Sequence, residues 1–175
     1  MPMSESLVRP ARKDDLSELV RLCAAHAAYE QADFNSGGKE SGLERLLFGP
    51  SPHLYCVVAE SPVPDAKSLV GYATWARQVS TWDADFYAYM DCLYLDPDAR
   101  GHGLGRILMG HLTRQAVAKG CKLVQWQTPV FNTRAMQFYD RLGARSLKKE
   151  RYFLDAAAMN RLVDELGTKE GGVTF

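Results

Sequence analysis

The stretch LYLDPDARGHGLGRILMGHL, residues 93–112, joins a strand-like apolar segment to a helix through three closely spaced glycines. Apolar residues recur at helical spacing after the glycines, which predicts a helix over residues 103–120. A strand that turns directly into a helix leaves the first backbone N–H groups of the helix unpaired, and the helix dipole favours an anion there. Glycine lets the backbone approach phosphate oxygens closely. We interpret the stretch as an anion cradle rather than as a tight connection that merely needs positive φ angles.

Two common phosphate-binding motifs do not fit these glycines. The loop of nucleotide hydrolases, G-x-x-x-x-G-K-[ST], requires a Lys and a Ser or Thr that are missing after Gly105. The dinucleotide motif G-x-G-x-x-G, read from Gly101, would need a third glycine where Arg106 stands. The pattern that remains is R-x-x-G-x-G, from Arg100 to Gly105.

Length and composition indicate one domain over residues 1–175, with 21 basic and 21 acidic residues. With this balance the protein has no large net charge that would attract nucleic acid or an anionic membrane surface, so we expect neither as a partner. The four cysteines form no C-x-x-C pair, and neither a signal peptide nor a membrane span is recognisable. We therefore expect a cytoplasmic protein with reduced thiols and no membrane association.

Periodicity and turn residues predict an alternation of strands and helices. Before the glycine stretch we expect strands at 6–11, 53–60, 68–79 and 86–95, helices at 13–31 and 42–49, and a turn at 61–67. After it we expect a strand at 121–130, a helix at 132–143, a strand or hairpin arm at 144–155, a helix at 156–167 and a frayed tail at 168–175. This order predicts an α/β (α+β) fold with a mixed sheet and without internal repeats.

The R-x-x-G-x-G motif, together with FNTRAMQFYDRLGA at 131–144, resembles the GNAT superfamily of acetyl-CoA-dependent N-acyltransferases. The resemblance covers residues 7–154 and implies a central twisted mixed β-sheet flanked by helices. Within the superfamily the chain is most similar to the diamine (spermidine/spermine) and thialysine acetyltransferase group. That likeness depends on RLCAAHAAYEQ at 21–31, HLYCVVAE at 53–60, YMDCLYLDPDARGHGLG at 89–105 and NTRAMQFYDRLGA at 132–144.

The resemblance implies that acetyl-CoA is the co-substrate. Backbone amides of the glycine segment would hold its pyrophosphate, the preceding strand would pair with its pantetheine arm, and Asn132 would hydrogen-bond that arm. The implied cofactor-binding residues are Leu93, Tyr94, Leu95, Arg100, Gly101, His102, Gly103, Leu104, Gly105, Arg106, Asn132 and Arg134.

Acetylation of an amine requires removal of a proton from an ammonium of pKa ~10.4 and protonation of the departing thiolate. A carboxylate within an apolar strand is unusual, and Asp91 stands where the resembling group carries an acidic residue near the amine. Asp91 is therefore the candidate base, although a cross-strand ion pair is the alternative and the usual residue of the group is the longer Glu. The resemblance places Tyr139 at the thioester as the candidate acid, whereas its pattern alone favours a core tyrosine.

The acceptor amine would be bound by Tyr29 and Glu30 at the end of the first long helix, by Asp91, and by the strand residues Gln125, Trp126 and Gln127. Glu30 is equally well read as a solvated helix-end charge. The basic residues between Arg145 and Arg151 would suit an acceptor that carries a carboxylate, or they form a solvated face.

We therefore expect direct acetyl transfer to a primary amine of a small molecule, namely a diamine, polyamine, amino acid or lysine analogue. The absence of a visible activated nucleophile disfavours a covalent acetyl-enzyme, and Cys92 is expected to be an inert thiol. The alternatives are a non-catalytic acyl-CoA sensor and a protein or peptide N-acetyltransferase. No metal site is expected, and the resemblance implies a homodimer.

Overall fold

The computed structural model describes residues 7–61, 63 and 69–167, and these contain a five-stranded sheet in the order β1-β2-β3-β4-β5. The strands are β1 (Val8–Pro10), β2 (Tyr55–Glu60), β3 (Leu69–Ser80), β4 (Asp85–Leu95) and β5 (Val124–Gln125). The first four pair antiparallel, whereas β5 runs parallel to β4. The predicted mixed sheet is confirmed.

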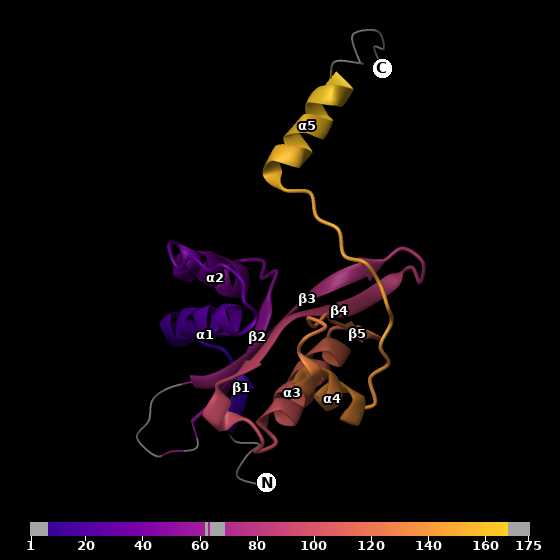
Figure 1. The fold of residues 1–175 in the computed structure, drawn as a ribbon. Helices are drawn as coiled ribbons and strands as arrows, with labels where there is room; N and C mark the ends of the chain where they lie inside the picture. The colour runs from indigo at the N-terminus through magenta and orange to yellow at the C-terminus, as the bar shows by residue number, and fades with distance from the viewer. Residues whose placement is uncertain (1–6, 62, 64–68, 168–175) are drawn as a thin grey trace. The chain divides into compact units, whose positions relative to one another are not determined.

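Helices cover both faces of this sheet, as Figure 1 shows. On one face lie α1 (Leu16–Tyr29) and α2 (Lys39–Phe48), and on the other lies α3 (Leu104–Ala118). Two short 3-10 helices, η2 (Lys13–Asp15) and η3 (Pro97–Ala99), precede α1 and the glycine segment. The predicted helix at 42–49 begins three residues earlier, at Lys39, because the left-handed Gly38 starts the first turn.

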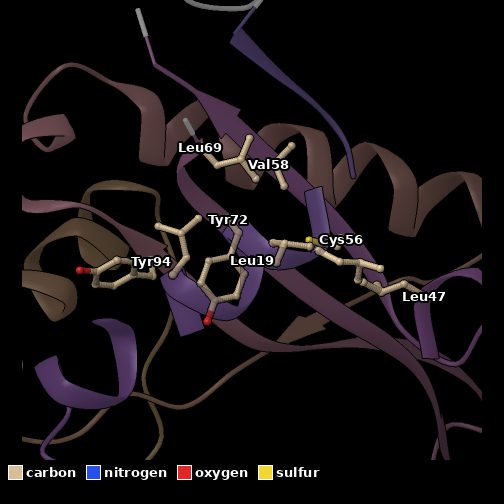
Figure 2. Packing of buried hydrophobic residues seen from close by; sticks show 9 residues of the cluster. Leu19, Leu47, Cys56, Val58, Leu69, Tyr72 and Tyr94 are labelled. Atoms are coloured by element: carbon tan, nitrogen blue, oxygen red, sulfur yellow. The ribbon is translucent and has the colours of Figure 1, made fainter. Parts of the chain in front are cut away.

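The apolar face of α1 packs into the hydrophobic core. Leu19 and Leu22 are almost fully buried and pack in one cluster with Val58 of β2, Tyr72 of β3 and Tyr94 of β4. Figure 2 shows that the Tyr72 and Tyr94 rings lie in this cluster while their hydroxyl groups point away from the packed aliphatic side chains. Two polar atoms thus reach the margin of an otherwise apolar core.

The two edges of β4 differ along its length. Its β3 edge is paired from Asp85 to Leu95, whereas β5 pairs only with Ala88 and Tyr89. The predicted strand at 121–130 is therefore reduced to two residues. From Met90 onward, β4 has no strand on that side within the described part of the chain. The free edge ends at Leu95, and η3 follows it along the chain before the glycine segment.

The chain divides into two compact units, Met1–Phe138 and Tyr139–Phe175. Helix α4 (Thr133–Arg141) spans the division, and α5 (Ala156–Gly167) belongs to the second unit. The strand predicted at 144–155 is wrong, since these residues form no strand. Four consecutive charged residues, 148–151, interrupt its apolar pattern, and a strand requires a partner to satisfy its backbone. The predicted tail at 168–175 and most of the predicted turn at 61–67 lie outside the described residues.

Candidate functional site

The glycine segment adopts a backbone conformation that ordinary residues avoid. Gly101 has φ 90° and Gly103 has φ 81°, both in the left-handed region that favours glycine. A Cβ atom added to either would meet no atom within 4 Å, so open space lies over the backbone at both positions. Gly105 differs, because it lies in the first turn of α3 and a Cβ atom added there would meet the Phe138 ring at 3.4 Å.

The same segment presents unpaired backbone donors. The N–H groups of Arg106 and Ile107 bond the Gly103 carbonyl at 3.0 and 3.2 Å. Within the described residues, the N–H groups of residues 101–105 have no such acceptor. Five consecutive donors at the positive end of a helix, with open space beside two of them, form a site for an anion. The arrangement is compatible with the predicted cradle, and anion binding there stays a prediction.

The residues predicted to hold the extended part of the co-substrate follow one another along β4. Leu93, Tyr94 and Leu95 pair with Ala73, Tyr72 and Gly71 of β3. Their other edge faces no strand in the described residues, so it is open to an extended ligand that carries amide groups. Along the chain, the open edge is followed by η3 and then by the glycine segment.

Arg100 is fixed by protein contacts at the start of the segment. Its Nε donates to the Leu95 carbonyl at 2.8 Å, and its guanidinium lies 4.5 Å from the centre of the Tyr29 ring and 5.5 Å from that of Tyr94. Such cation–π contacts stabilise the guanidinium and fix its direction. Arg100 therefore joins the end of α1 to the glycine segment, and its predicted contact with the co-substrate stays a prediction.

Asn132 links the end of α1 to the start of α4. Its Oδ1 accepts hydrogen bonds from the Tyr29 hydroxyl and from the Ala135 N–H, each at 3.2 Å. The second bond is a helix N-cap, as expected for Asn before a helix. Both bonds use Oδ1, so the Nδ2 group keeps its donors for a ligand. Among the other predicted cofactor residues, Leu104 is buried, whereas His102, Arg106 and Arg134 are exposed.

Asp91 is the extra residue of a β-bulge. Thr74 pairs with Cys92 and Trp75 with Met90, so Asp91 stands between them without a partner on β3. A bulge redirects a side chain out of the regular alternation, and Asp91 is exposed although both neighbours are at least half buried. No lysine or arginine forms a salt bridge with Asp91 in the described residues, which disfavours the cross-strand ion pair. The Cys92 thiol donates a weak hydrogen bond to it, with Sγ 3.7 Å from Oδ2.

The cysteines near Asp91 are poor nucleophiles. Burial, together with the charge of Asp91, raises the pKa of the Cys92 thiol to about 12. Burial also raises the pKa of Cys23. Both remain thiols at neutral pH, which supports direct transfer over a covalent acetyl-enzyme.

Sequence reasoning missed a group on α1 that the structure brings to this place. His26 lies with its Nε2 3.4 Å from Glu30 Oε1 and its Nδ1 3.1 Å from the Tyr72 hydroxyl. The i,i+4 spacing of His26 and Glu30 was the available signal. Its contacts with β3 and β4, by contrast, depend on tertiary packing.

The remaining predicted residues have mixed placements. Gln125 and Gln127 are exposed on and after β5, and Gln127 Nε2 donates to the Tyr89 hydroxyl at 3.1 Å. Trp126 is half buried. Tyr139 is half buried on α4 and is the first residue of the second compact unit. The roles of all four stay predictions.

An open strand edge, followed along the chain by unpaired N–H groups at a helix N-terminus, suits an extended ligand that carries phosphate. The sequence model of the Acetyltransferase (GNAT) family matches residues 17–144, and the chain belongs to this family.

Individual relatives agree with this assignment. The chain is 31% identical to the thialysine N-epsilon-acetyltransferase of Bos taurus, over 83% of this chain and 87% of the relative. It is 30% identical to the peptidyl-lysine N-acetyltransferase YjaB of Escherichia coli (strain K12), over 78% and 80%. An aminoglycoside acetyltransferase from an uncultured soil metagenomic sample has the same fold, with a TM-score of 0.69 at 20% identity over 84% and 94%.

The predicted likeness to the diamine and thialysine group is confirmed, and the protein is an N-acetyltransferase. In the part of the chain that the structure describes, no helix has both the length and the apolar character to cross a bilayer. The same residues contain no group of three or more His, Cys, Asp or Glu side chains placed to hold a metal ion.

Proposed function

We propose that the protein transfers an acetyl group from acetyl-CoA directly to a primary amine of a small molecule. The observation that carries the proposal is the row of unpaired N–H groups at residues 101–105, which follows the open edge of β4 along the chain. It provides an anion site and an extended strip in the order that a pyrophosphate and a pantetheine arm require.

The residues present fit the co-substrate. The N–H groups from Gly101 to Gly105 would hold the pyrophosphate, assisted by the exposed cations of Arg106 and Arg134. The open edge of Leu93–Leu95 would pair with the amide groups of the arm, and Asn132 would add donors from Nδ2. Acetyl-CoA supplies the activated acetyl thioester.

The acceptor side is proposed to lie where the bulge of β4 meets the end of α1. Asp91 is the exposed carboxylate there, and Tyr29 and Glu30 form the end of the helix. Carboxylates attract an ammonium group and take up its proton, either directly or through water. Tyr139 remains the proposed donor of a proton to the leaving thiolate.

The proposed acceptors are diamines, polyamines, amino acids and lysine analogues. The Bos taurus relative named for thialysine, a lysine analogue, supports an acceptor that has both an amine and a carboxylate. The Escherichia coli relative named for peptidyl-lysine supports a second candidate, acetylation of lysine in a peptide.

The test is thiol release from acetyl-CoA across diamines, polyamines, amino acids, lysine analogues and lysine peptides, with Tyr139→Phe beside the wild type. We expect turnover with a free amine, and a large loss of kcat in Tyr139→Phe at unchanged acetyl-CoA affinity, because the variant lacks the donor proton. Turnover with peptides alone would favour the second candidate. An unchanged kcat in the variant would remove Tyr139 from the mechanism.

Binding of acetyl-CoA without turnover of any acceptor would instead support a non-catalytic sensor. A cytoplasmic location and a homodimer remain part of the proposal, and sedimentation of the purified protein tests the dimer.

A further inference from the structure

His26 is a histidine held by three elements of the first compact unit. It lies on α1, its Nδ1 is 3.1 Å from the hydroxyl of Tyr72 on β3, and its ring stacks on Tyr94 of β4 with centroids 5.2 Å apart. Its Nε2 is 3.4 Å from Oε1 of Glu30, and its side chain is 14% exposed. A ring fixed in this way has one nitrogen directed into the core and the other directed at the acceptor-side carboxylate.

The charged groups around His26 come from several elements. Glu30 contacts it from the same helix, Asp91 acts on it from the bulge of β4, and Arg100 acts on it from the start of the glycine segment. The two carboxylates favour the protonated ring and the guanidinium opposes it. The neighbouring hydroxyls of Tyr72 and Tyr94 stay uncharged, because burial raises the pKa of both phenols.

We propose that the proton lost by the acceptor ammonium passes first to Glu30 and then to His26. This inference rests on the proposed function and names the proton route of the same site. One N–H bond of the ammonium breaks and leaves its electron pair on nitrogen. The proton bonds to a carboxylate oxygen of Glu30 and then to Nε2, so Glu30 is again a carboxylate and the ring is an imidazolium. The ring later releases to water the one proton that acetylation of an ammonium produces.

The route requires the neutral tautomer with its proton on Nδ1. In that form Nδ1 donates to the Tyr72 oxygen, and the lone pair of Nε2 faces Glu30. In that form the Tyr72 hydroxyl accepts from Nδ1 and turns its own hydrogen away from the ring. Burial lowers the pKa of His26, against the opposing effect of Glu30, so the ring is neutral at pH 7 and able to accept a proton.

His26 acts through Glu30, so it is a positioning and relay residue, and its test is the pH profile. His26→Gln keeps a donor near Glu30 but takes up no proton. We expect kcat at neutral pH to fall about a hundredfold, as on the loss of a general base. The wild-type rate should decline as pH falls through the pKa of His26, below its ordinary value of ~6.5, and this acid limb should vanish in the variant. The matched control, His53→Gln, replaces an exposed histidine and should keep the wild-type profile.

A second measurement does not depend on activity. Nitrogen-15 NMR of the four histidines, with His26→Gln identifying the signal, reports both tautomer and pKa. We expect a neutral ring protonated at Nδ1 and a pKa below ~6.5. An Nε2–H tautomer, a protonated ring at pH 7, or a wild-type profile in a folded His26→Gln variant would each overturn the relay. A wild type that acetylates no amine would refute the proposed function instead, while the NMR result would still describe the ring.

Discussion

Asp91 owes its exposure to a backbone irregularity rather than to its place in the strand alternation. As the extra residue of the bulge, it has no partner on β3, and its side chain is exposed. An exposed carboxylate without a lysine or arginine partner in the described residues is available to an incoming ammonium.

We therefore predict that Asp91→Asn raises KM for the amine and lowers kcat/KM about a hundredfold, because the variant loses the negative charge that attracts the acceptor ammonium. Steady-state kinetics with the best amine of the panel measures this effect. Affinity for acetyl-CoA should not change. Asp83→Asn, which replaces an exposed aspartate at the turn between β3 and β4, is the control and should behave as the wild type. Equal losses in the two variants would refute a specific role for Asp91.

For single residues, prediction from the sequence succeeded where the residue type is tied to one backbone conformation or one contact. The glycines at 101 and 103 were recognisable because their left-handed backbone excludes most other residues. His26 was not recognisable, since its partners Tyr72 and Tyr94 lie far away in sequence and meet it only through the packing of α1 on the sheet. The bulge at Asp91 left no mark in the sequence either.

At the scale of elements, the segment between β4 and α3 connects an open strand edge to the N-terminus of a helix. Gly103 is the residue at which the chain turns into α3, and its φ of 81° strains any β-branched side chain. An added Cβ would meet no neighbour, so the strain would act on the loop and not on the core.

Gly103→Val is therefore predicted to abolish acetyl-CoA binding in a protein that still folds, because the loop must rearrange and its N–H groups no longer converge. Calorimetric titration measures the affinity, and circular dichroism measures the fold. Gly110→Ala, on the exposed face of the same helix, is the control and should bind normally with equal or slightly higher stability. Wild-type affinity in Gly103→Val would refute the cradle.

The sequence predicted best the helices and strands that have a clear pattern of apolar residues and recognisable residues at their ends. Helix α3 shows an apolar face before Gly120, and the long strands β3 and β4 are rich in aromatic and β-branched residues. The strand predicted at 121–130 shrank to Val124–Gln125, since strand length depends on a partner that the segment itself does not encode. The same reason accounts for the missing strand at 144–155.

At the scale of the whole molecule, one ion-pair network joins the start of the chain to the sheet. Both guanidinium Nη atoms of Arg9 on β1 bond the two oxygens of Asp15, at 2.7 and 2.9 Å. Arg9 Nε bonds Glu60 of β2 at 2.6 Å, and the Arg12 N–H adds a bond to Asp15 at 2.6 Å. Asp15 is buried, so it depends on these partners for the solvation it has lost.

This network stabilises the folded protein at neutral pH, and the stabilisation is lost in acid. Burial raises the pKa of Asp15, but the hydrogen bonds from Arg9 and the Arg12 N–H outweigh it, and the net pKa is lowered. A lowered folded-state pKa stabilises the protein above the unfolded value of ~3.9, and this stability disappears as pH falls through the folded value. Asp15→Asn should therefore lower the free energy of unfolding by about 3 kcal/mol at neutral pH.

Urea unfolding of the wild type and the variant at neutral pH and near pH 3 tests this prediction, and the difference should shrink in acid because the wild-type carboxyl is then increasingly protonated. The exposed pair of Lys13 and Glu44 is the control, with Lys13→Gln expected to cost about 0.5 kcal/mol or less. A difference between Asp15→Asn and the wild type that persists unchanged into acid would mean that Asp15 stabilises the fold through shape and not through its charge.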